Sequence, residues 1–395
     1  MQVQVRSGDS LWNYSQLFLI PLNLIIDSNP NINPTAIQPG QRVQIPGFTT
    51  QSYRIKQGDT LWGIARRRNL TVDALLLINQ DKNPNQLRIG DIIQLPQRVI
   101  SPLTNRATPY TFSLLTSDIE RMKEIYPFIK INTIGQSVLG KPIQEIRLGK
   151  GTKKVHLDAS FHANEWITTP ILMEVLNTFL LSLTNGNSIR GRSSMPLYQA
   201  VDLSIVPMVN PDGVNLVIDG PPSEMREEII RINKGSTDFT DWKANIRGVD
   251  LNNQFPANWE IEKERKEEKA PAPRDYPGDA PLTEPEAIAM ANLARNRSFD
   301  RLLALHTQGE EFYWGYEGLE PSESRILAEE FERVSGYKAV QYIDSHAGYK
   351  DWFIQEFRRP GFTIELGMGT NPLPLSQFKE IYEEFLGIFL ASLYM

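Results

Sequence analysis

Two histidines and two glutamates carry the clearest chemical potential in this chain. His162 and Glu165 stand three positions apart, a spacing that lets both side chains turn toward one point. His306 and Glu365 lie far along the sequence, and the whole chain has only four histidines. Two imidazole nitrogens and one carboxylate, with a fourth position left to water, form a catalytic zinc site. The residue types therefore favour metal-assisted hydrolysis.

Apolar segments place these residues at the ends of strands. Residues 155–161 predict a buried strand, and residues 167–176 predict a helix with a proline in its first turn. The pair His162 and Glu165 therefore sits at a strand-to-helix corner, where open α/β sheets place ligands. Residues 302–305 predict another strand, which ends at a further histidine.

Five separated motifs agree with one known family. They are the His162–Glu165 pair, His306 with the Thr-Gln-Gly that follows it, and the segments 210–213, 248–252 and 362–366. In this order the motifs resemble those of the zinc carboxypeptidase family, over residues 108–395. The resemblance implies an α/β fold in which helices flank a mixed sheet. The competing Ser/His/Asp scheme is disfavoured because the chain has no Gly-x-Ser-x-Gly.

The resemblance implies a role for each matching residue. His162, Glu165 and His306 match the family's zinc ligands, with one zinc ion per chain. Glu365 matches its general base, which takes a proton from water and delivers it to the leaving amine. Asp250 matches the carboxylate that orients the first ligand histidine and so fixes its tautomer and basicity.

The substrate-binding side departs from the family at one position. Where carboxypeptidases have Asn-Arg, this chain has Asn252-Asn253, so the bidentate cationic clamp for a terminal carboxylate is lost. An enzyme that cuts an internal bond needs no such clamp, and the departure therefore favours an endopeptidase. Lys243 and Arg247 are cations nearby that could serve a substrate carboxylate, and Lys243 falls roughly where the family has another substrate-facing arginine.

Two tyrosines and two histidines complete the candidate set. The family's substrate-gating tyrosine matches either Tyr342, which is one position from the expected place, or Tyr349. Strand alternation turns His156 away from its neighbour Leu157, which favours a structural role. His346 lies in a predicted loop that could line the pocket, and we do not predict it as a ligand.

An internal repeat with an offset of fifty residues fills the first hundred positions. Residues 7–12 recur as residues 57–62, and residues 39–46 recur as residues 89–96. Each unit reads as strand, turn, helix, helix and strand, because Gly-Asp-Ser/Thr supplies a turn and then a helix N-cap. The repeat therefore predicts two small βααβ modules.

Both units, residues 2–46 and 52–97, resemble LysM modules, a family that binds N-acetylglucosamine-containing glycans such as peptidoglycan and chitin. The resemblance implies a contact surface between the loop after the first strand and the loop before the second strand. The candidate glycan-binding residues are Gly8, Asp9, Ser10, Asn29, Gly58, Asp59, Thr60 and Asn79. The alternative for each of them is a purely structural role in shaping a turn or a cap.

The composition of the chain disfavours several other classes of function and site. A net charge of −6 provides no basic field for nucleic acid, and the absence of cysteine excludes thiolate zinc sites, cysteine nucleophiles and disulfides. No run approaches the length of a membrane span, and no signal sequence precedes the first repeat, which predicts a cytoplasmic product. Residues 98–107 predict a linker, and the charge run 260–269 predicts a solvated insertion that is helical or mobile.

The combination of these parts predicts the function. Two glycan-binding modules would bring a zinc peptidase to cell-wall polymer, whose peptides contain γ-linked D-glutamate and diamino acids. This pairing resembles the bacterial γ-D-glutamyl-L-diamino acid endopeptidases. We therefore expect hydrolysis of the γ-D-glutamyl bond to meso-diaminopimelate or L-Lys in wall peptides, during lysis, sporulation or recycling. The alternatives are a metallocarboxypeptidase acting on ordinary peptides and a non-catalytic wall-binding protein.

Overall fold

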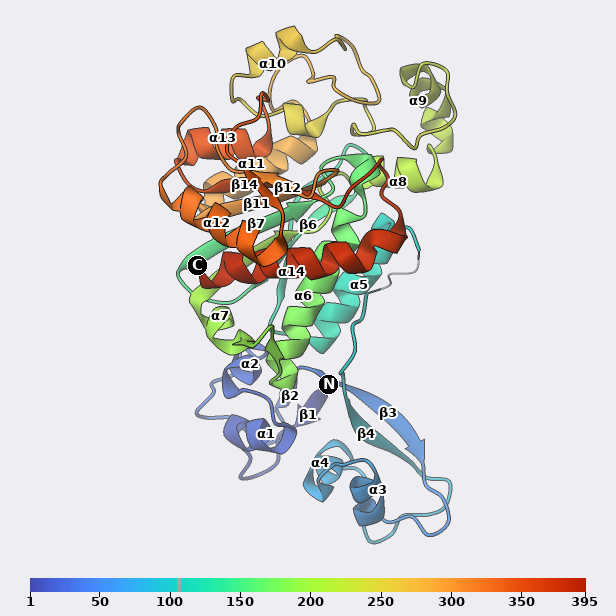
Figure 1. Cartoon of the computed structure of the whole chain (residues 1–395). Coiled ribbons are helices and arrows are strands. Elements are labelled where there is room, and N and C mark those ends of the chain that lie inside the picture. Colours follow the sequence, from blue (N-terminus) through green and yellow to red (C-terminus); the bar gives the residue numbers. More distant parts are fainter. Residues whose placement is uncertain (105–107) are drawn as a thin grey trace. The chain divides into compact units, whose positions relative to one another are not determined.

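The computed structural model describes residues 1–104 and 108–395 (Figure 1). The described chain forms two compact units. The first comprises Met1–Leu103, Asp118–Lys130 and Asn177–Met195, and the second comprises Thr104–Ser117, Ile131–Leu176 and Pro196–Met395. The predicted linker 98–107 extends into residues 105–107, which lie outside the described residues.

The two repeats adopt the same strand, helix, helix, strand order (Figure 1). In each repeat the two strands pair antiparallel. The elements of the first repeat are β1 (Gln2–Gln4), α1 (Leu11–Phe18), α2 (Leu22–Asp27) and β2 (Arg42–Gln44). Those of the second are β3 (Phe48–Arg54), α3 (Leu61–Arg67), α4 (Val72–Ile78) and β4 (Ile92–Arg98). The predicted βααβ modules are therefore confirmed.

The Gly-Asp-Ser/Thr turns form as their residue types require. Gly8 has φ +86° and Gly58 has φ +82°, a left-handed conformation that glycine adopts without a steric penalty. Ser10 Oγ accepts a hydrogen bond from the backbone N–H of Asn13 at 3.1 Å. Thr60 Oγ1 accepts the equivalent bond from Gly63 at 3.0 Å. The first helix of each module therefore begins with the predicted cap.

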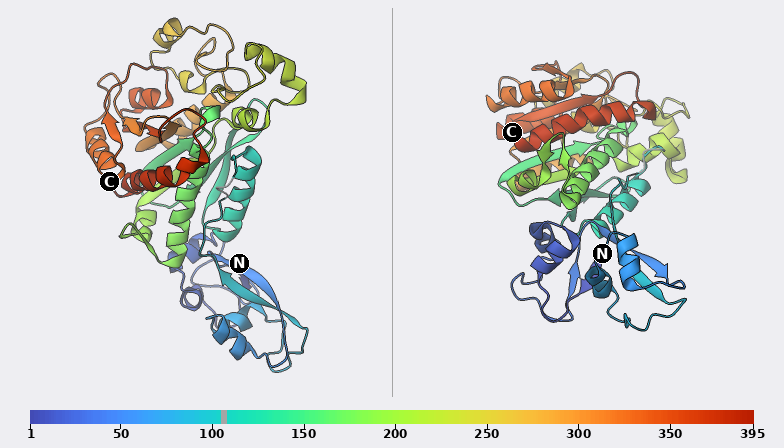
Figure 2. Two further views of the ribbon diagram at one scale, coloured as in Figure 1. Left: turned by 45° about the vertical axis from the view of Figure 1, so that its right-hand side comes forward. Right: turned by 60° about the horizontal axis from the view of Figure 1, so that its bottom comes forward.

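An eight-stranded mixed sheet forms the centre of the larger fold (Figure 2). The strand order is β13-β12-β14-β11-β7-β10-β6-β5, and the four central strands β14, β11, β7 and β10 run parallel. The strands are β5 (Lys130–Gln136), β6 (Pro142–Leu148), β7 (Lys153–Ala159), β10 (Val201–Val206), β11 (Arg301–Thr307), β12 (Glu311–Tyr313), β13 (Lys338–Val340) and β14 (Gly361–Leu366). A separate hairpin pairs β8 (Ser188–Ile189) with β9 (Arg192–Ser193).

Helices cover both faces of this sheet, as predicted (Figures 1 and 2). On one face, α11 and α13 pack on β10 and β11 in a core that includes Met290, Trp352 and Leu302. The views show α6, α12 and α14 along the opposite face. The helices are α5 (Phe112–Ile125), α6 (Thr168–Asn185), α7 (Ser194–Ala200), α8 (Pro211–Asp219), α9 (Arg226–Ile232), α10 (Trp259–Arg265), α11 (Pro285–Arg297), α12 (Glu323–Ser335), α13 (Tyr349–Phe357) and α14 (Phe378–Tyr394).

Two predictions about apolar and charged runs need correction. By length and composition, residues Ala163–Asn185 could cross a membrane, contrary to the sequence prediction, but 89% of their most apolar 18-residue stretch is buried inside the fold. It is best described as a core helix. The charge run is helical only to Arg265, and Glu262 within it is fully buried, because Arg265 and Lys266 pair with its carboxylate at 2.8 and 3.3 Å.

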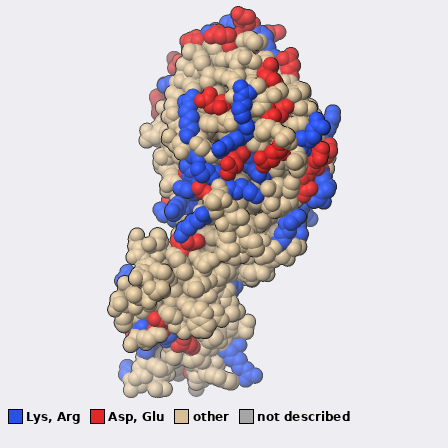
Figure 3. Space-filling model, turned by 90° about the vertical axis from the view of Figure 1, so that its left-hand side faces the viewer, with Lys and Arg blue, Asp and Glu red and all other residues tan. Residues whose placement is uncertain are grey.

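Charged side chains of both signs are interspersed over the upper part of the face drawn in Figure 3, and its lower part carries fewer of them. That view shows no continuous basic surface, in line with the net charge of −6.

Candidate metal centre and catalytic cavity

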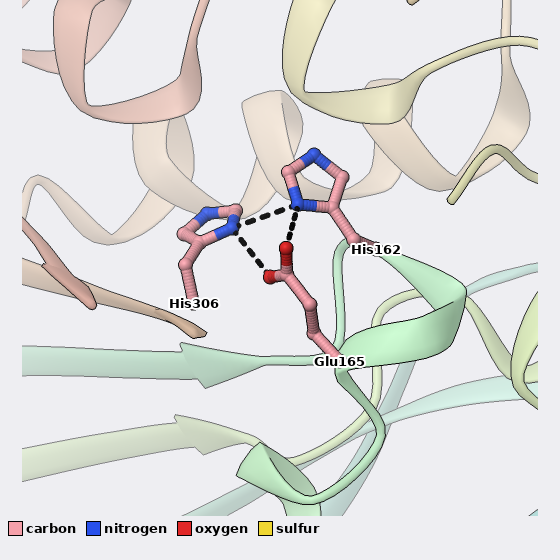
Figure 4. A group of neighbouring side chains, drawn as sticks. All are labelled: His162, Glu165 and His306. Carbon is pink, nitrogen blue, oxygen red and sulfur yellow. Dashed lines mark hydrogen bonds and ion pairs between the residues drawn. The ribbon is translucent and has the colours of Figure 1, made fainter. Parts of the chain in front are cut away.

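A tight corner after β7 presents His162 and Glu165 together. Ser160 has φ +51° and turns the chain out of the strand. Its backbone N–H donates to Thr168 Oγ1 at 3.0 Å, and that hydroxyl donates to the carbonyl of Glu165 at 2.8 Å. These bonds tie the strand end to the start of α6. The short 3-10 turn Ala163–Glu165 between them points both functional side chains the same way (Figure 4).

Strand register brings His306 and Glu365 to the same edge. β11 lies beside β7 and β14 and runs parallel to both, and His306 is paired directly with Glu365. Residues paired across neighbouring strands project to the same face. The carboxyl ends of β7, β11 and β14 therefore meet at one point, where α/β sheets bind ligands.

Three buried side chains converge at this edge (Figure 4). His162 Nδ1 lies 3.0 Å from Glu165 Oε1, and His306 Nδ1 lies 3.0 Å from Glu165 Oε2. The two Nδ1 atoms are 3.0 Å apart. The ligand atoms of this group all lie within 4.8 Å of one another. Among the described residues no other group of three or more His, Cys, Asp or Glu is close enough to hold a metal ion.

The donor atoms fit a bound cation. His162 Nε2 donates to Asp250 Oδ1 at 3.2 Å, so the neutral imidazole keeps a lone pair on Nδ1. That lone pair faces a second imidazole nitrogen and a carboxylate. Burial of several acceptor lone pairs close together raises the free energy of the folded state unless a positively charged partner binds them. This set of donors matches a zinc site. It has two imidazole nitrogens, one carboxylate and a second carboxylate that orients one imidazole through a hydrogen bond.

Burial and neighbouring charges perturb the titration of this group. Burial opposes ionisation of Asp250, but His162 beside it holds the pKa of that carboxyl well below its usual range. Burial likewise opposes ionisation of Glu165, yet the two imidazoles keep its pKa low. Burial lowers the pKa of His306. Burial raises the pKa of Glu365 well above its ordinary value, and the nearby Glu165 charge adds to the effect.

A cavity of about 270 Å³ opens over the cluster. The predicted residues that line it are His162, Glu165, Lys243, Asp250, Asn252, Asn253, His306 and Glu365. The cavity thus joins the three convergent side chains, the carboxylate of Asp250 and the predicted proton acceptor. Further lining residues that the sequence did not single out include Lys266, Tyr313, Lys350 and Thr363.

The nearby cations and amides differ in their placement. Lys243 Nζ lies 4.0 Å from Glu165 Oε1, so its charge stands directly beside the cluster. Arg247 pairs instead with Glu284 at 3.5 Å and does not line the cavity. Asn252 lines the cavity, while its Oδ1 accepts from the backbone N–H of Tyr349.

Neither candidate gating tyrosine lines the cavity in this structure. Tyr349 is fully buried and its hydroxyl donates to the carbonyl of Met290 at 3.3 Å. Tyr342 is 53% exposed and its hydroxyl donates to Glu320 at 2.7 Å. The tyrosine that does line the cavity is Tyr313, on β12. The alternation of side chains in the short strand after His306 could have indicated Tyr313 from the sequence. The strand that pairs with this short strand could not be known from the sequence.

The two remaining histidines have structural partners. His156 is fully buried, shares a hydrogen bond with Ser204 Oγ at 3.0 Å and stacks on Phe299. Burial lowers its pKa to about 3, so it stays neutral. His346 Nδ1 shares a hydrogen bond with Tyr316 Oη at 3.1 Å. It does not line the cavity.

The candidate glycan-binding residues of the modules make internal bonds. Asn29 Nδ2 donates to the carbonyls of Ile25 and Gln44 at 2.7 and 2.9 Å, and Asn79 repeats this pattern in the second module. Asp9 accepts from Arg6 and Tyr14, and Asp59 accepts from Tyr53 and Arg67. Ser10 and Thr60 cap helices, as described above. These contacts favour the structural alternative for the buried members of the set.

Comparison with known proteins agrees with the fold and the site. A sequence profile of the family described as zinc carboxypeptidase matches residues 115–386, and the LysM domain profile matches residues 3–46 and 53–96. The chain belongs to the zinc carboxypeptidase family, and the M14-type catalytic fold makes it a zinc-dependent hydrolase.

Individual relatives refine this assignment. The chain is 62% identical over 397 residues to Gamma-D-glutamyl-L-diamino acid endopeptidase 1 of Lysinibacillus sphaericus, with all of both chains covered. Among solved structures, it resembles thrombin activatable fibrinolysis inhibitor with a TM-score of 0.57 and 19% identity, covering 74% of this chain and 76% of the other. Carboxypeptidase A from Helicoverpa armigera gives a TM-score of 0.53 at 16% identity, covering 99% and 95%. The structural likenesses concern the fold alone.

Proposed function

We propose that this protein is a peptidoglycan peptidase that hydrolyses the γ-D-glutamyl bond to a diamino acid in cell-wall peptides. The convergence of His162, Glu165 and His306 beside Glu365, in a cavity with no arginine among its described lining residues, is the observation that carries the proposal. The full-length similarity to a γ-D-glutamyl-L-diamino acid endopeptidase supports the substrate class.

The chain's own residues divide the chemistry between them. His162, Glu165 and His306 would hold zinc, which when bound supplies the Lewis acidity that polarises a peptide carbonyl and acidifies water. Asp250 fixes the orientation of the first histidine through its hydrogen bond. Glu365, which is paired with His306 on the neighbouring strand, would take a proton from water and return it to the leaving amine.

The charges in the cavity suit a γ-linked glutamate. A γ-D-glutamyl residue keeps a free α-carboxylate close to the bond that is cut. Lys243 lies beside the cluster and offers a flexible ammonium for that carboxylate. Asn253 lines the cavity where a carboxypeptidase has an arginine, so no rigid cationic fork selects a chain end.

A comparison of substrates tests this function. The purified protein should cleave a γ-D-glutamyl–diaminopimelate peptide at the γ-bond and leave an ordinary peptide with a free C-terminus almost intact. Mass analysis of the products distinguishes the two reactions. Preferential release of single C-terminal residues from ordinary peptides would instead favour a metallocarboxypeptidase. No cleavage of either class by zinc-loaded protein would favour the non-catalytic wall-binding alternative.

We propose that the two LysM modules, residues 2–46 and 52–97, hold the enzyme on wall glycan, while residues 108–395 form the peptidase. The repeats contain none of the four proposed catalytic and ligand residues. Trp12 and Trp62, at equivalent positions, are 59% and 62% exposed, and exposed aromatic rings offer apolar faces of the kind that sugars can stack on.

Removal of residues 1–100 should separate wall binding from chemistry. We expect the truncated chain to keep cleaving small soluble wall peptides and to sediment much less with insoluble peptidoglycan. Two modules should also outbind one, because tethering makes the second contact intramolecular. The measurement is a sedimentation assay run beside soluble-substrate kinetics.

The truncation experiment needs a control for folding, because the truncation removes only part of one compact unit. The unit that contains the modules also includes Asp118–Lys130 and Asn177–Met195, so a melting curve of the truncated chain is recorded beside the kinetics. Equal wall binding by the full and truncated chains would contradict the targeting role. A folded truncated chain without soluble-substrate activity would show that the modules help to build the active site.

A further inference from the structure

Few protein groups hold the carboxylate of Glu165 in place. Its two oxygens face His162 Nδ1 and His306 Nδ1, each at 3.0 Å (Figure 4). These are the nitrogens whose lone pairs would bind the metal, so they cannot also serve as fixed hydrogen-bond donors to Glu165. Lys243 Nζ, at 4.0 Å, is beyond hydrogen-bonding distance. In the described chain one further side chain donates to this carboxylate, because Asn371 Nδ2 lies 3.5 Å from Glu165 Oε1.

Asn371 reaches Glu165 from outside the catalytic cavity. It lies in the segment that follows β14 and is only 7% exposed. It is not among the residues that line the cavity, whereas Glu165 is. A molecule that enters the cavity therefore does not contact the Asn371 side chain. Any effect of this amide on the chemistry must act through Glu165.

A hydroxyl on the neighbouring strand fixes the orientation of the Asn371 amide. Thr307, the last residue of β11, donates from Oγ1 to Asn371 Oδ1 at 2.7 Å. The opposite orientation of the amide would set Oδ1 against the carboxylate of Glu165, and two acceptors facing each other repel. The N–H donors of Asn371 therefore point to Glu165. The three side chains form a chain of hydrogen bonds from hydroxyl to amide to carboxylate.

The turn after β11 also holds the segment that carries Asn371. The backbone N–H of Gln308 donates to the carbonyl of Leu366, the last residue of β14, at 3.1 Å. The side chain of Gln308 donates from Nε2 to the carbonyl of Gly369 at 2.9 Å. The strand pair that brings His306 to the metal cluster thus also fixes the approach of Asn371 to that cluster.

We propose that Asn371 is a positioning residue for Glu165, the candidate carboxylate ligand, and that Thr307 orients the Asn371 amide for this role. A glutamate side chain has several rotatable bonds, and restricting them costs conformational entropy. A donor fixed on Oε1 restricts the carboxylate before a metal binds, so that Oε2 stays beside His306. Asp250 acts on His162 in the same manner, and such outer-shell partners raise metal affinity.

The arrangement links two of the three candidate ligands. Thr307 directly follows His306, so one hydrogen-bond chain joins the end of β11 to the carboxylate of Glu165. His306 and Glu165 come from segments far apart in the sequence, and this chain keeps them in register. The inference rests on the ligand assignment made above and does not depend on which wall bond the enzyme cuts.

The first test measures the zinc affinity of the full-length chain. Asn371→Leu keeps the size of the side chain and removes the amide donor. We expect its zinc dissociation constant to rise about 10- to 100-fold, the usual effect of losing an outer-shell partner. The constant is measured by competition with a chromogenic zinc chelator on metal-free protein. The melting midpoint of the same metal-free sample reports on the fold. A purely structural role would lower this midpoint and leave the zinc constant of the folded protein unchanged.

A matched control removes the same kind of hydrogen bond elsewhere. Asn132 Nδ2 donates to Glu145 Oε2 at 3.0 Å, and neither residue lines the cavity. Asn132→Leu should keep the wild-type zinc constant. If the wild-type chain binds zinc and folded Asn371→Leu binds it equally well, the inference is overturned. The ligand assignment and the proposed substrate would then stand or fall by their own experiments.

The second test examines the link from Thr307 to Asn371. Thr307→Val keeps the shape of the side chain without the hydroxyl, and Thr307→Ser keeps the hydroxyl. We expect weaker zinc binding for the valine variant and near wild-type binding for the serine variant. Adding Thr307→Val to Asn371→Leu should cause no further loss, because residues that act through one hydrogen-bond chain are not additive. Wild-type affinity in Thr307→Val, or fully additive losses, would overturn the link. If Asn371→Leu does not fold, the valine and serine variants decide the inference.

Discussion

Replacement of Glu365 by glutamine is expected to abolish turnover while the fold and the zinc remain. Glutamine has nearly the same shape but cannot accept a proton from water. Glu365 lies on β14, directly paired with His306, and is not among the three convergent side chains that could hold a metal ion. The expected fall in kcat is at least the roughly 10²- to 10⁴-fold that general acid–base catalysis supplies.

The measurement combines kinetics on a soluble γ-D-glutamyl peptide with metal analysis of the same sample. Glu380→Gln, on the exposed side of α14, is the matched control and should keep the wild-type rate. Retained zinc with lost turnover would place Glu365 in the chemical step. A near-normal rate would remove Glu365 from the mechanism, and loss of zinc would make it a ligand instead.

The double variant His162→Ala, His306→Ala is expected to lose bound zinc. The wild-type chain should carry one zinc ion after purification without added metal. Loss of even an outer-shell partner weakens metal affinity roughly 10- to 100-fold, and loss of two direct ligands should exceed this. Elemental analysis of the purified proteins measures the metal content directly.

His346→Ala serves as the control for that experiment, because His346 contacts Tyr316 and does not line the cavity. It should keep its zinc. The thermal midpoint gives a second reading, since a ligand that binds the folded chain stabilises it and its loss lowers the midpoint. Zinc retained by the double variant would disprove the ligand assignment.

Local sequence patterns were sufficient to predict much of the secondary structure and the two modules. Apolar runs of strand length ending at chemistry-bearing residues predicted β7 and β11, and the proline in the first turn of α6 marked its start. The repeated Gly-Asp-Ser/Thr turns predicted both modules, because caps and left-handed glycines depend on neighbouring residues alone. These features require no knowledge of what packs against them.

The residues of the metal cluster could also be predicted, partly from their spacing and partly from the family resemblance. Spacing joined His162 to Glu165, and the family resemblance supplied His306 and Glu365. Only the register of β11 against β14 determines that the last two face each other. Register depends on hydrogen bonding between strands distant in the chain, so spacing within one segment cannot specify it.

The residues that the sequence misjudged are those whose surroundings come from several elements. Tyr349 was a candidate at the pocket but packs in the core, while Tyr313 lines the cavity through its pairing with Thr363. The sequence predicted a solvated charge run that includes Glu262, but this side chain is buried and pairs with basic side chains.

The sequence by itself therefore determined the element types and the repeated modules, which follow from local spacing and backbone preference, and its resemblance to a known family indicated the metal-binding residues. Only the tertiary structure decided which side chains share the cavity, and it brought Lys350 and Asp351 into it. The physical reason is that burial and the pairing of charges depend on neighbours from distant segments, which meet only when the sheet and its covering helices have assembled.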